Sequence, residues 1–285
     1  MSEEQKFAFG TEKSPEDNRD YIVESIIPQS VAFPATLDLR DKLPKVKDQG
    51  SQGSCSAMTA STIKEYHEHV DVRFTGEMSP QFIYNLRYNQ DSEGMSPRDT
   101  MKILQRIGAV PEYRYQYGTQ ESATKLMKNE ELQKVASNYQ IDEYSKVQTI
   151  DGLKQALYKN GVCYVAFPVY NYGKEFWKKD SDDDQIQGGH AVAICGYTSE
   201  GFIIRNSWGT DWGNEGYTLY KYSDFGLHWE IWTAIDENSR EDNDPWYTKL
   251  WYKFSNWYVF NKQVFWMLTG FGTFAIGTFI LSLNQ

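Results

Sequence analysis

The feature that constrains the fold most is a change in sequence pattern near residue 144. Before it, the signals are helical: Ser79-Pro80 is typical of a helix start, and Gly108 ends the helical pattern of residues 100–107. After it, apolar and β-branched residues come in short runs, at residues 162–169, 191–197, 202–205, 217–222 and 230–235. This order predicts an α+β fold of two lobes, with a cleft between them as the natural place for a site.

Shifts in composition divide the 285 residues further. The charged residues 1–32 are predicted to form an N-terminal arm that contributes little to a core. A globular body follows at 33–237, with the helical lobe at about 45–145 and the β lobe at about 146–237. The composition of residues 238–263 predicts a polar linker followed by an aromatic segment next to a membrane.

Residues 264–283 are 20 consecutive residues without a charge, just long enough to span a bilayer as a helix. Aromatic residues surround the start of this segment, as they do at membrane interfaces. Lysines precede the span and none follows it, which predicts a single-pass, tail-anchored membrane protein whose body faces the cytosol. The alternative is an apolar tail folded onto the body.

Composition also limits the partners. A formal net charge of -10 argues against a nucleic acid, because phosphate binding needs clustered Lys and Arg. Three cysteines make a poor disulfide framework, and Cys163 and Cys195 lie in apolar runs typical of buried strands. No Cys and His spacing indicates a metal site, and no cofactor is predicted. Residues 1–10 are acidic and polar and lack the basic and apolar regions of a secretion signal.

Cys55 follows the glycine-rich turn Gln49-Gly-Ser-Gln-Gly-Ser and opens a helical stretch at 56–70. A cysteine at a helix N-terminus faces unpaired backbone N–H groups, which favour the nucleophilic thiolate. The N–H of Cys55 and the side-chain amide of Gln49 could together donate to a developing oxyanion. The alternative is a half-buried structural cysteine.

His190 begins an apolar run after Gly188-Gly189, where its ring would lie at the exposed end of a strand. Asn206 and Trp208 follow later, in a segment rich in Gly-Trp pairs. An asparagine can hold an imidazole in the tautomer that a base needs, and an indole can keep water off that hydrogen bond. Taken alone, each of these residues could equally be structural.

Together these segments resemble the papain family of cysteine peptidases, over roughly residues 10–237. The resemblance implies a two-lobe fold and roles for the matching residues. Cys55 would attack the peptide carbonyl, His190 would accept and return the proton, and Asn206 would orient His190. Gln49 would complete the oxyanion hole, and Trp208 would shield the contact between His190 and Asn206.

Several motifs resemble particular branches of the family. Gly188-Gly189-His190 is the form found in cathepsin B-like members, and other short motifs resemble a disulfide-poor branch of bacteria, archaea and large DNA viruses. Gln52 stands where secreted members usually have a cysteine. Ser56 replaces the usual aromatic residue after the nucleophile, which predicts a more open oxyanion region.

The resemblance also implies residues that bind substrate. Gly94 lies in the stretch expected to pair with an extended peptide, and a glycine there lets the backbone approach. Gly189 precedes the catalytic histidine. Glu230 would lie near the floor of a specificity pocket, which would then tolerate a basic side chain at the second residue before the cut. The alternatives are a simple turn at Gly94 and a solvent-facing Glu230.

The sequence therefore predicts a membrane-anchored cysteine endopeptidase that acts on peptides or proteins through a thioester. The alternatives are an inactive binding protein on the same fold and a peptide ligase that uses the same residues. The arm is predicted to be a short inhibitory propeptide that reaches the cleft. Its alternative is a structural brace around Arg19-Asp20-Tyr21.

Overall fold

The structure is a computed structural model that describes residues 8–25 and 33–236. Its strands form one antiparallel sheet in the order β2-β7-β3-β4-β5-β6, and β1 pairs with β4. The strands are β1 (Leu37–Asp38), β2 (Glu143–Val147), β3 (Cys163–Val169), β4 (Gly188–Tyr197), β5 (Gly201–Arg205), β6 (Tyr217–Lys221) and β7 (Glu230–Ile235).

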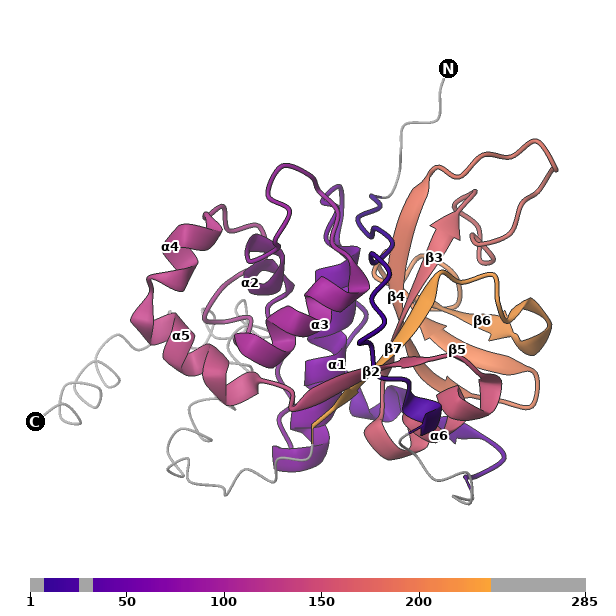
Figure 1. The fold of residues 1–285 in the computed structure, drawn as a ribbon, viewed down its shortest axis with the longest axis horizontal. Coiled ribbons are helices and arrows are strands. Elements are labelled where there is room, and N and C mark those ends of the chain that lie inside the picture. Colours follow the sequence, from indigo (N-terminus) through magenta and orange to yellow (C-terminus); the bar gives the residue numbers. More distant parts are fainter. Residues whose placement is uncertain (1–7, 26–32, 237–285) are drawn as a thin grey trace, which may run out of the picture. The chain divides into compact units, whose positions relative to one another are not determined.

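Most of the helices precede the sheet in the sequence. They are α1 (Cys55–Val72), α2 (Pro80–Asn85), α3 (Pro97–Arg106), α4 (Ala123–Met127), α5 (Glu130–Ala136) and α6 (Ile150–Asn160). Short 3₁₀ turns lie at Val23–Ser25, Arg40–Lys42, Ser137–Tyr139 and Tyr222–Asp224. In Figure 1 helices α1 to α5 lie on one side and the sheet on the other. The α+β arrangement predicted from the sequence is confirmed.

Local sequence explains where these helices begin. The side chains of Ser79 and Ser96 accept hydrogen bonds from the N–H groups of Phe82 and Asp99, and a proline follows each serine. This combination satisfies an otherwise unpaired N–H and presets the helical backbone angle. Helix α1 is different, since Ser54 makes no capping bond and most of the helix is buried. Packing rather than capping therefore stabilises α1.

Two clusters of buried apolar residues flank the sheet. One fills the space between α1, α2, α3 and the sheet, around Ile63, Phe82 and Trp232. The other lies on the opposite face under α6, around Phe167 and Trp177. Because α1 packs on β3 and β4, the N-terminus of α1 is fixed against the strand that carries His190.

The N-terminal arm runs between the helices and the sheet, as the indigo trace in Figure 1 shows. Thr11 forms a parallel bridge with Met95, and Ile22 forms another with Lys146. In residues 8–25 and 33–236 no helix is both long and apolar enough to cross a bilayer. The predicted span at 264–283 and the linker at 238–263 lie outside the described residues.

Candidate active site

Cys55 is the first residue of α1 and is fully buried. Its sulfur accepts a hydrogen bond from the N–H of Ala191 at 3.4 Å. Ala191 follows His190 in β4, so the strand brings the histidine and the cysteine to one place. The helix supplies the unpaired N–H groups of its first turn to the same point.

His190 and Asn206 are joined by a hydrogen bond of 2.7 Å between Nε2 and Oδ1. Asn206 Oδ1 also accepts from the N–H of Ser207 at 2.7 Å, which fixes this oxygen as an acceptor. His190 Nε2 must then carry the proton, which leaves Nδ1 with a lone pair. Nδ1 is buried and has no hydrogen-bond partner among the described residues. It is therefore the basic atom available to Cys55.

Aromatic rings enclose this histidine. Trp208 stacks on it with ring centroids 4.3 Å apart, and Phe176 meets it edge-on at 5.3 Å. Both rings are buried, so they exclude water from the bond between His190 and Asn206. Phe176 comes from the loop before β4, which the sequence marks only by its acidic residues.

His190 differs from its expected place at the exposed end of a strand. Strand β4 begins at Gly188, and His190 is its third residue, fully buried and opposite Phe167 of β3. Gly188 and Gly189 pair with Val169 and Pro168, which extends the strand by two glycines that sequence propensity disfavours. The expectation of an exposed ring is therefore wrong for this state of the protein.

Gln49 is oriented by bonds at both ends of its side chain. Its Oε1 accepts from Ser207 Oγ at 2.7 Å. Its Nε2 donates to the carbonyl oxygens of Gln52 at 2.9 Å and Ala8 at 3.2 Å. The Nε2 group thus already binds a peptide carbonyl of the arm, which is the contact that an oxyanion-hole donor must make.

The arm fills the cleft beside these residues. The N–H groups of Gly10 and Thr11 donate to the Gly189 carbonyl at 3.2 and 3.1 Å. Across the cleft, Met95 N–H donates to Gly10 at 3.0 Å and the Met95 carbonyl accepts from Glu12 at 3.1 Å. The arm is therefore bound through its backbone, in the way that an added strand or an extended peptide is bound.

Two residues show how closely the arm fits the cleft. A Cβ atom on Gly10 would lie 1.7 Å from the carbonyl oxygen of Gly53, so only glycine fits there. Phe9 stacks on Tyr172 at 5.4 Å and also meets Trp208 at 6.2 Å. The arm thus lies against the turn before the nucleophile and against the aromatic rings around the histidine.

Burial sets the ionisation of the catalytic pair. It raises the pKa of Cys55 to about 11, although hydrogen bonds from the N–H groups of Ala191 and Gly10 oppose it. It lowers the pKa of His190 to about 4 against the opposing bond to Asn206. At neutral pH both groups are therefore uncharged while the arm is in place, and the thiolate expected at the helix N-terminus is not favoured.

The structure brings the four predicted catalytic residues together and places the predicted binding residues along the arm. Gly189 binds the arm through its carbonyl, while Met95, next to Gly94, makes the backbone pairs expected of that stretch. Glu230 is buried and accepts from Ser14 N–H at 2.7 Å and from Trp232 Nε1 at 2.8 Å. In this state Glu230 holds the arm backbone.

Ser56 does not open the site as its small size predicts. It is fully buried, and the space beside it is filled by Tyr164, whose hydroxyl donates to Ser56 Oγ at 2.8 Å. Sequence reasoning missed Tyr164, since an aromatic residue in an apolar run is most often only core, and it missed Tyr172 and Phe176, which lie in a polar loop with no local sign of a site. It also missed Tyr117, whose hydroxyl bonds to the Gln49 carbonyl at 2.9 Å and to Ser54 Oγ at 2.6 Å.

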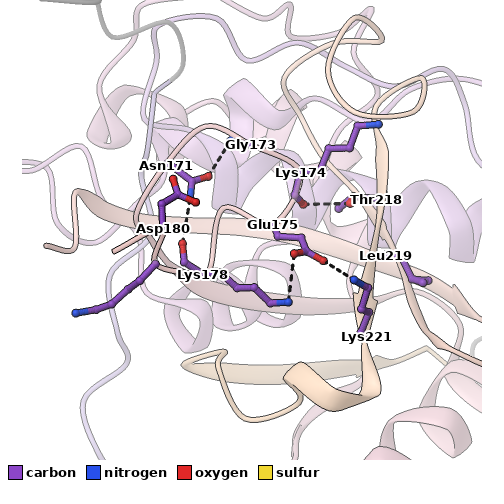
Figure 2. A pocket seen from close by; sticks show the side chains of 10 residues that line it. Asn171, Gly173, Lys174, Glu175, Lys178, Asp180, Thr218, Leu219 and Lys221 are labelled. Atoms are coloured by element: carbon purple, nitrogen blue, oxygen red, sulfur yellow. Dashed lines mark hydrogen bonds and ion pairs between the residues drawn. The ribbon is translucent and has the colours of Figure 1, made fainter. Parts of the chain in front are cut away.

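A separate surface hollow of about 590 Å³ contains none of the catalytic residues. Figure 2 shows that Glu175 lies between Lys178 and Lys221, with which it forms ion pairs at 3.2 and 3.0 Å. The hollow is lined by four lysines and two acidic residues, so its lining keeps an excess of positive charge. No cluster of metal-ligating side chains exists in the described ranges 8–25 and 33–236.

Comparison with known proteins agrees with this geometry. A family model described as "Papain family cysteine protease" matches residues 33–230. The chain belongs to the papain family. This confirms the resemblance inferred from the sequence motifs.

Two relatives and one solved structure illustrate the similarity. The chain is 27% identical over 199 residues to cysteine proteinase 3 of Entamoeba histolytica, covering 66% of this chain but only 63% of that protein. It is 28% identical over 282 residues to an uncharacterized peptidase C1-like protein of Acanthamoeba polyphaga mimivirus, covering 81% of this chain and 89% of that protein.

The structure is similar to that of xylellain, a cysteine protease from Xylella fastidiosa. The TM-score is 0.68 at 27% identity, and the match covers 84% of this chain and 99% of xylellain. The similarity therefore extends over nearly the whole of the xylellain chain.

Proposed function

We propose that this protein is a cysteine endopeptidase. The observation that carries the proposal is the arrangement of Cys55, His190 and Asn206, in which Asn206 fixes the tautomer of His190 and leaves Nδ1 as a base. An inactive binding protein would have no need of this alignment. Family membership and the orientation of the Gln49 amide support the same activity.

The reaction follows from these groups. The thiol of Cys55 passes its proton to His190 Nδ1, and the sulfur attacks the peptide carbonyl. Gln49 Nε2 and the N–H of Cys55 donate to the oxyanion. His190 returns the proton to the leaving amine as the C–N bond breaks, which leaves a thioester on Cys55. Water, deprotonated by His190, hydrolyses the thioester and releases the acid.

We also propose that the arm keeps this site inactive. Ala8 occupies the Gln49 donor, Gly10 and Thr11 occupy the Gly189 carbonyl, and burial of Cys55 in this closed state raises its pKa and makes the neutral thiol the stable form. A substrate must displace all of these contacts. Because the arm is tethered, its effective concentration is high and modest contacts suffice to block substrate.

Anchoring in a membrane is a further part of the proposal, and it rests on the sequence of residues 264–283. Their length and lack of charge support a single span, and the preceding lysines support a body on the cytosolic side. Expression of the full chain in cells, followed by carbonate extraction and protease protection, tests this. Release by carbonate would exclude a span, and protection of the body in sealed vesicles would exclude the cytosolic orientation.

The test of the peptidase is labelling with an epoxide that traps active cysteines, with the modified residue located by mass spectrometry. Cys55→Ala should abolish both labelling and hydrolysis while the thermal unfolding midpoint stays close to that of the parent. Asn206→Ala should lower turnover less, because Asn206 orients His190 and does not react. Turnover that persists in Cys55→Ala would exclude the mechanism. Transfer of the acyl group to an added amine in place of water would indicate a ligase.

A further inference from the structure

Three hydroxyl groups meet beside the nucleophile, and one of them belongs to the arm. Thr11 Oγ1 lies 2.9 Å from Ser56 Oγ and 3.0 Å from the hydroxyl of Tyr164. Tyr164 and Ser56 are fully buried, and Thr11 is only 5% exposed. These three residues are called the hydroxyl niche.

The hydrogen bonds of the hydroxyl niche form one consistent chain. Tyr164 donates to Ser56 at 2.8 Å, Ser56 donates to Thr11 at 2.9 Å, and Thr11 donates to the Met95 carbonyl at 3.0 Å. Each hydroxyl has one proton to donate, and each proton has an acceptor. Chains of this kind strengthen one another in a dry interior, where an unpaired hydroxyl is costly.

The body supplies two parts of the chain, and a ligand supplies the third. Ser56 directly follows Cys55, and Tyr164 reaches it from β3, so both are fixed by the fold. Thr11 belongs to the segment that occupies the cleft between Gly189 and Met95. When the arm leaves, whatever side chain enters this space meets the Ser56 and Tyr164 hydroxyls.

We propose that Ser56 and Tyr164 form a subsite that selects a threonine or serine side chain, first of the arm and then of the substrate. This inference rests on the proposed peptidase function and names its substrate class: peptides with a hydroxyl-bearing residue on the acyl side of the cut. A side chain without a hydroxyl removes the 2.9 Å bond from Ser56 and the 3.0 Å bond to the Met95 carbonyl, and it leaves Ser56 only longer bonds, to the carbonyls of Met95 at 3.2 Å and Gly10 at 3.4 Å. A site built to bond a hydroxyl discriminates against the analogue that lacks it.

The first test uses the full chain and measures the rate at which iodoacetamide alkylates Cys55. Thr11→Val keeps the shape of the side chain but removes the hydroxyl, and it should raise the rate about tenfold because the arm is held less tightly. Thr11→Ser keeps the hydroxyl and should stay within about twofold of the parent. Thr75→Val, at an exposed position beyond the far end of α1, is the matched control and should not change the rate. Equal rates for Thr11→Val and the parent would overturn the inference.

The second test varies the residues of the niche. The enzyme is the full chain that carries Thr11→Val, and the substrates are peptides in which each position on the acyl side of the cut is changed in turn. At one of these positions, a peptide with Thr or Ser should be cut about tenfold faster than the same peptide with Val. Adding Ser56→Ala or Tyr164→Phe should remove this preference while the chain still unfolds cooperatively. A preference that survives both changes, or one for apolar residues throughout, would overturn the inference.

The two tests separate this inference from the proposed peptidase. Alkylation needs only an accessible thiol and no turnover. If Thr11→Val changes the alkylation rate but the protein cuts no peptide, recognition of the arm hydroxyl is supported and the peptidase is refuted. Hydrolysis without any dependence on hydroxyl groups would support the peptidase and refute the subsite.

Discussion

The two ends of the described arm are bound by different kinds of contact. Residues 8–14 lie in the cleft and are bound mainly by backbone hydrogen bonds to Gly189 and Met95. Residues 17–25 lie on the body outside the catalytic residues and are bound mainly by charged side chains, beside one backbone bond from the Lys146 N–H to the Tyr21 carbonyl at 2.8 Å. Asp20 pairs with Arg98 at 2.5 Å and with Lys146 at 3.0 Å, and Glu24 accepts from the N–H groups of Gln148 and Thr149 at 2.8 Å.

This difference separates blocking from tethering. In the proposed function the first segment, residues 8–14, blocks the site, mainly through backbone contacts and also through the close fit of Gly10 and the hydroxyl of Thr11. The second segment, residues 17–25, touches no catalytic residue but keeps the first segment close to the cleft. Under the proposed function, inhibition and bracing, which the sequence presents as alternatives, belong to different residues of one arm. The first prediction below concerns the thiol while both segments are in place, and each test substitution after it disturbs one segment.

The largest effect is expected from pH. With the arm in place burial raises the pKa of Cys55 to about 11, so the thiolate fraction should increase about 1000-fold between pH 7 and pH 10. The rate of Cys55 alkylation by iodoacetamide should follow that increase in the full chain. A rate that levels off near neutral pH would show that the arm does not control the thiol.

The next largest effect is expected from Gly10→Ala, which disturbs only the blocking segment. The new Cβ would lie 1.7 Å from the Gly53 carbonyl, which is backbone and cannot yield, so residues 8–14 must leave their place. Alkylation of Cys55 at pH 7 should rise about 100-fold, since overpacking of this kind costs about 3 kcal/mol.

Gly173→Ala is the control for that variant. The nearest atom to its new Cβ is the side-chain oxygen of Asn171 at 3.1 Å, which can move. Its alkylation rate should equal that of the parent. If Gly10→Ala and Gly173→Ala behave alike, residues 8–14 are not the block.

A smaller effect is expected from Asp20→Asn, which disturbs the tether. Burial raises the pKa of Asp20, but hydrogen bonds from Arg98 and Lys146 outweigh it and hold the pKa below its usual range. At pH values above the pKa that Asp20 has in the unfolded chain, its carboxylate therefore stabilises the docked arm. That stabilisation is lost as the pH falls through the lower pKa of Asp20 in the folded protein. Asp20→Asn should raise Cys55 alkylation at pH 7 a few-fold.

The pH dependence provides the check on that interpretation. In the parent the alkylation rate, corrected for thiolate fraction, should rise when the buffer is taken below pH 4. In Asp20→Asn that acid-dependent rise should be absent. An equal rise in both proteins would assign it to another carboxylate and remove Asp20 from the tether.

The smallest effect on the site is expected from Glu24→Gln, at the far end of the tether. Its Oε1 accepts from two backbone N–H groups and from the Thr149 hydroxyl at 3.0 Å, and these bonds become weaker without the charge. The free energy of unfolding, measured by urea denaturation, should fall by about 1 kcal/mol. Cys55 alkylation should not change, and a large change would show that the tether and the block act as one unit.

The sequence by itself determined the parts that depend on neighbouring residues. Ser79-Pro80 predicted the start of α2, and the fold class followed from the change of pattern near residue 144. The family also followed from the sequence, because the motifs around Cys55, His190 and Asn206 keep their residue types and order along the chain. These signals are local, so one chain carries them without reference to its fold.

Only the tertiary structure decided what surrounds those residues. The sequence does not show that Phe176 joins Trp208 in enclosing His190, that Tyr164 fills the space beside Ser56, or that Gly10 fits against Gly53. Each of these contacts joins residues that are distant in the chain, with nothing local to mark the partner. The ionisation of Cys55 depends on these distant contacts as well. A helix N-terminus favours the thiolate, whereas burial favours the thiol. Only the packing of the folded chain decides that burial outweighs the helix.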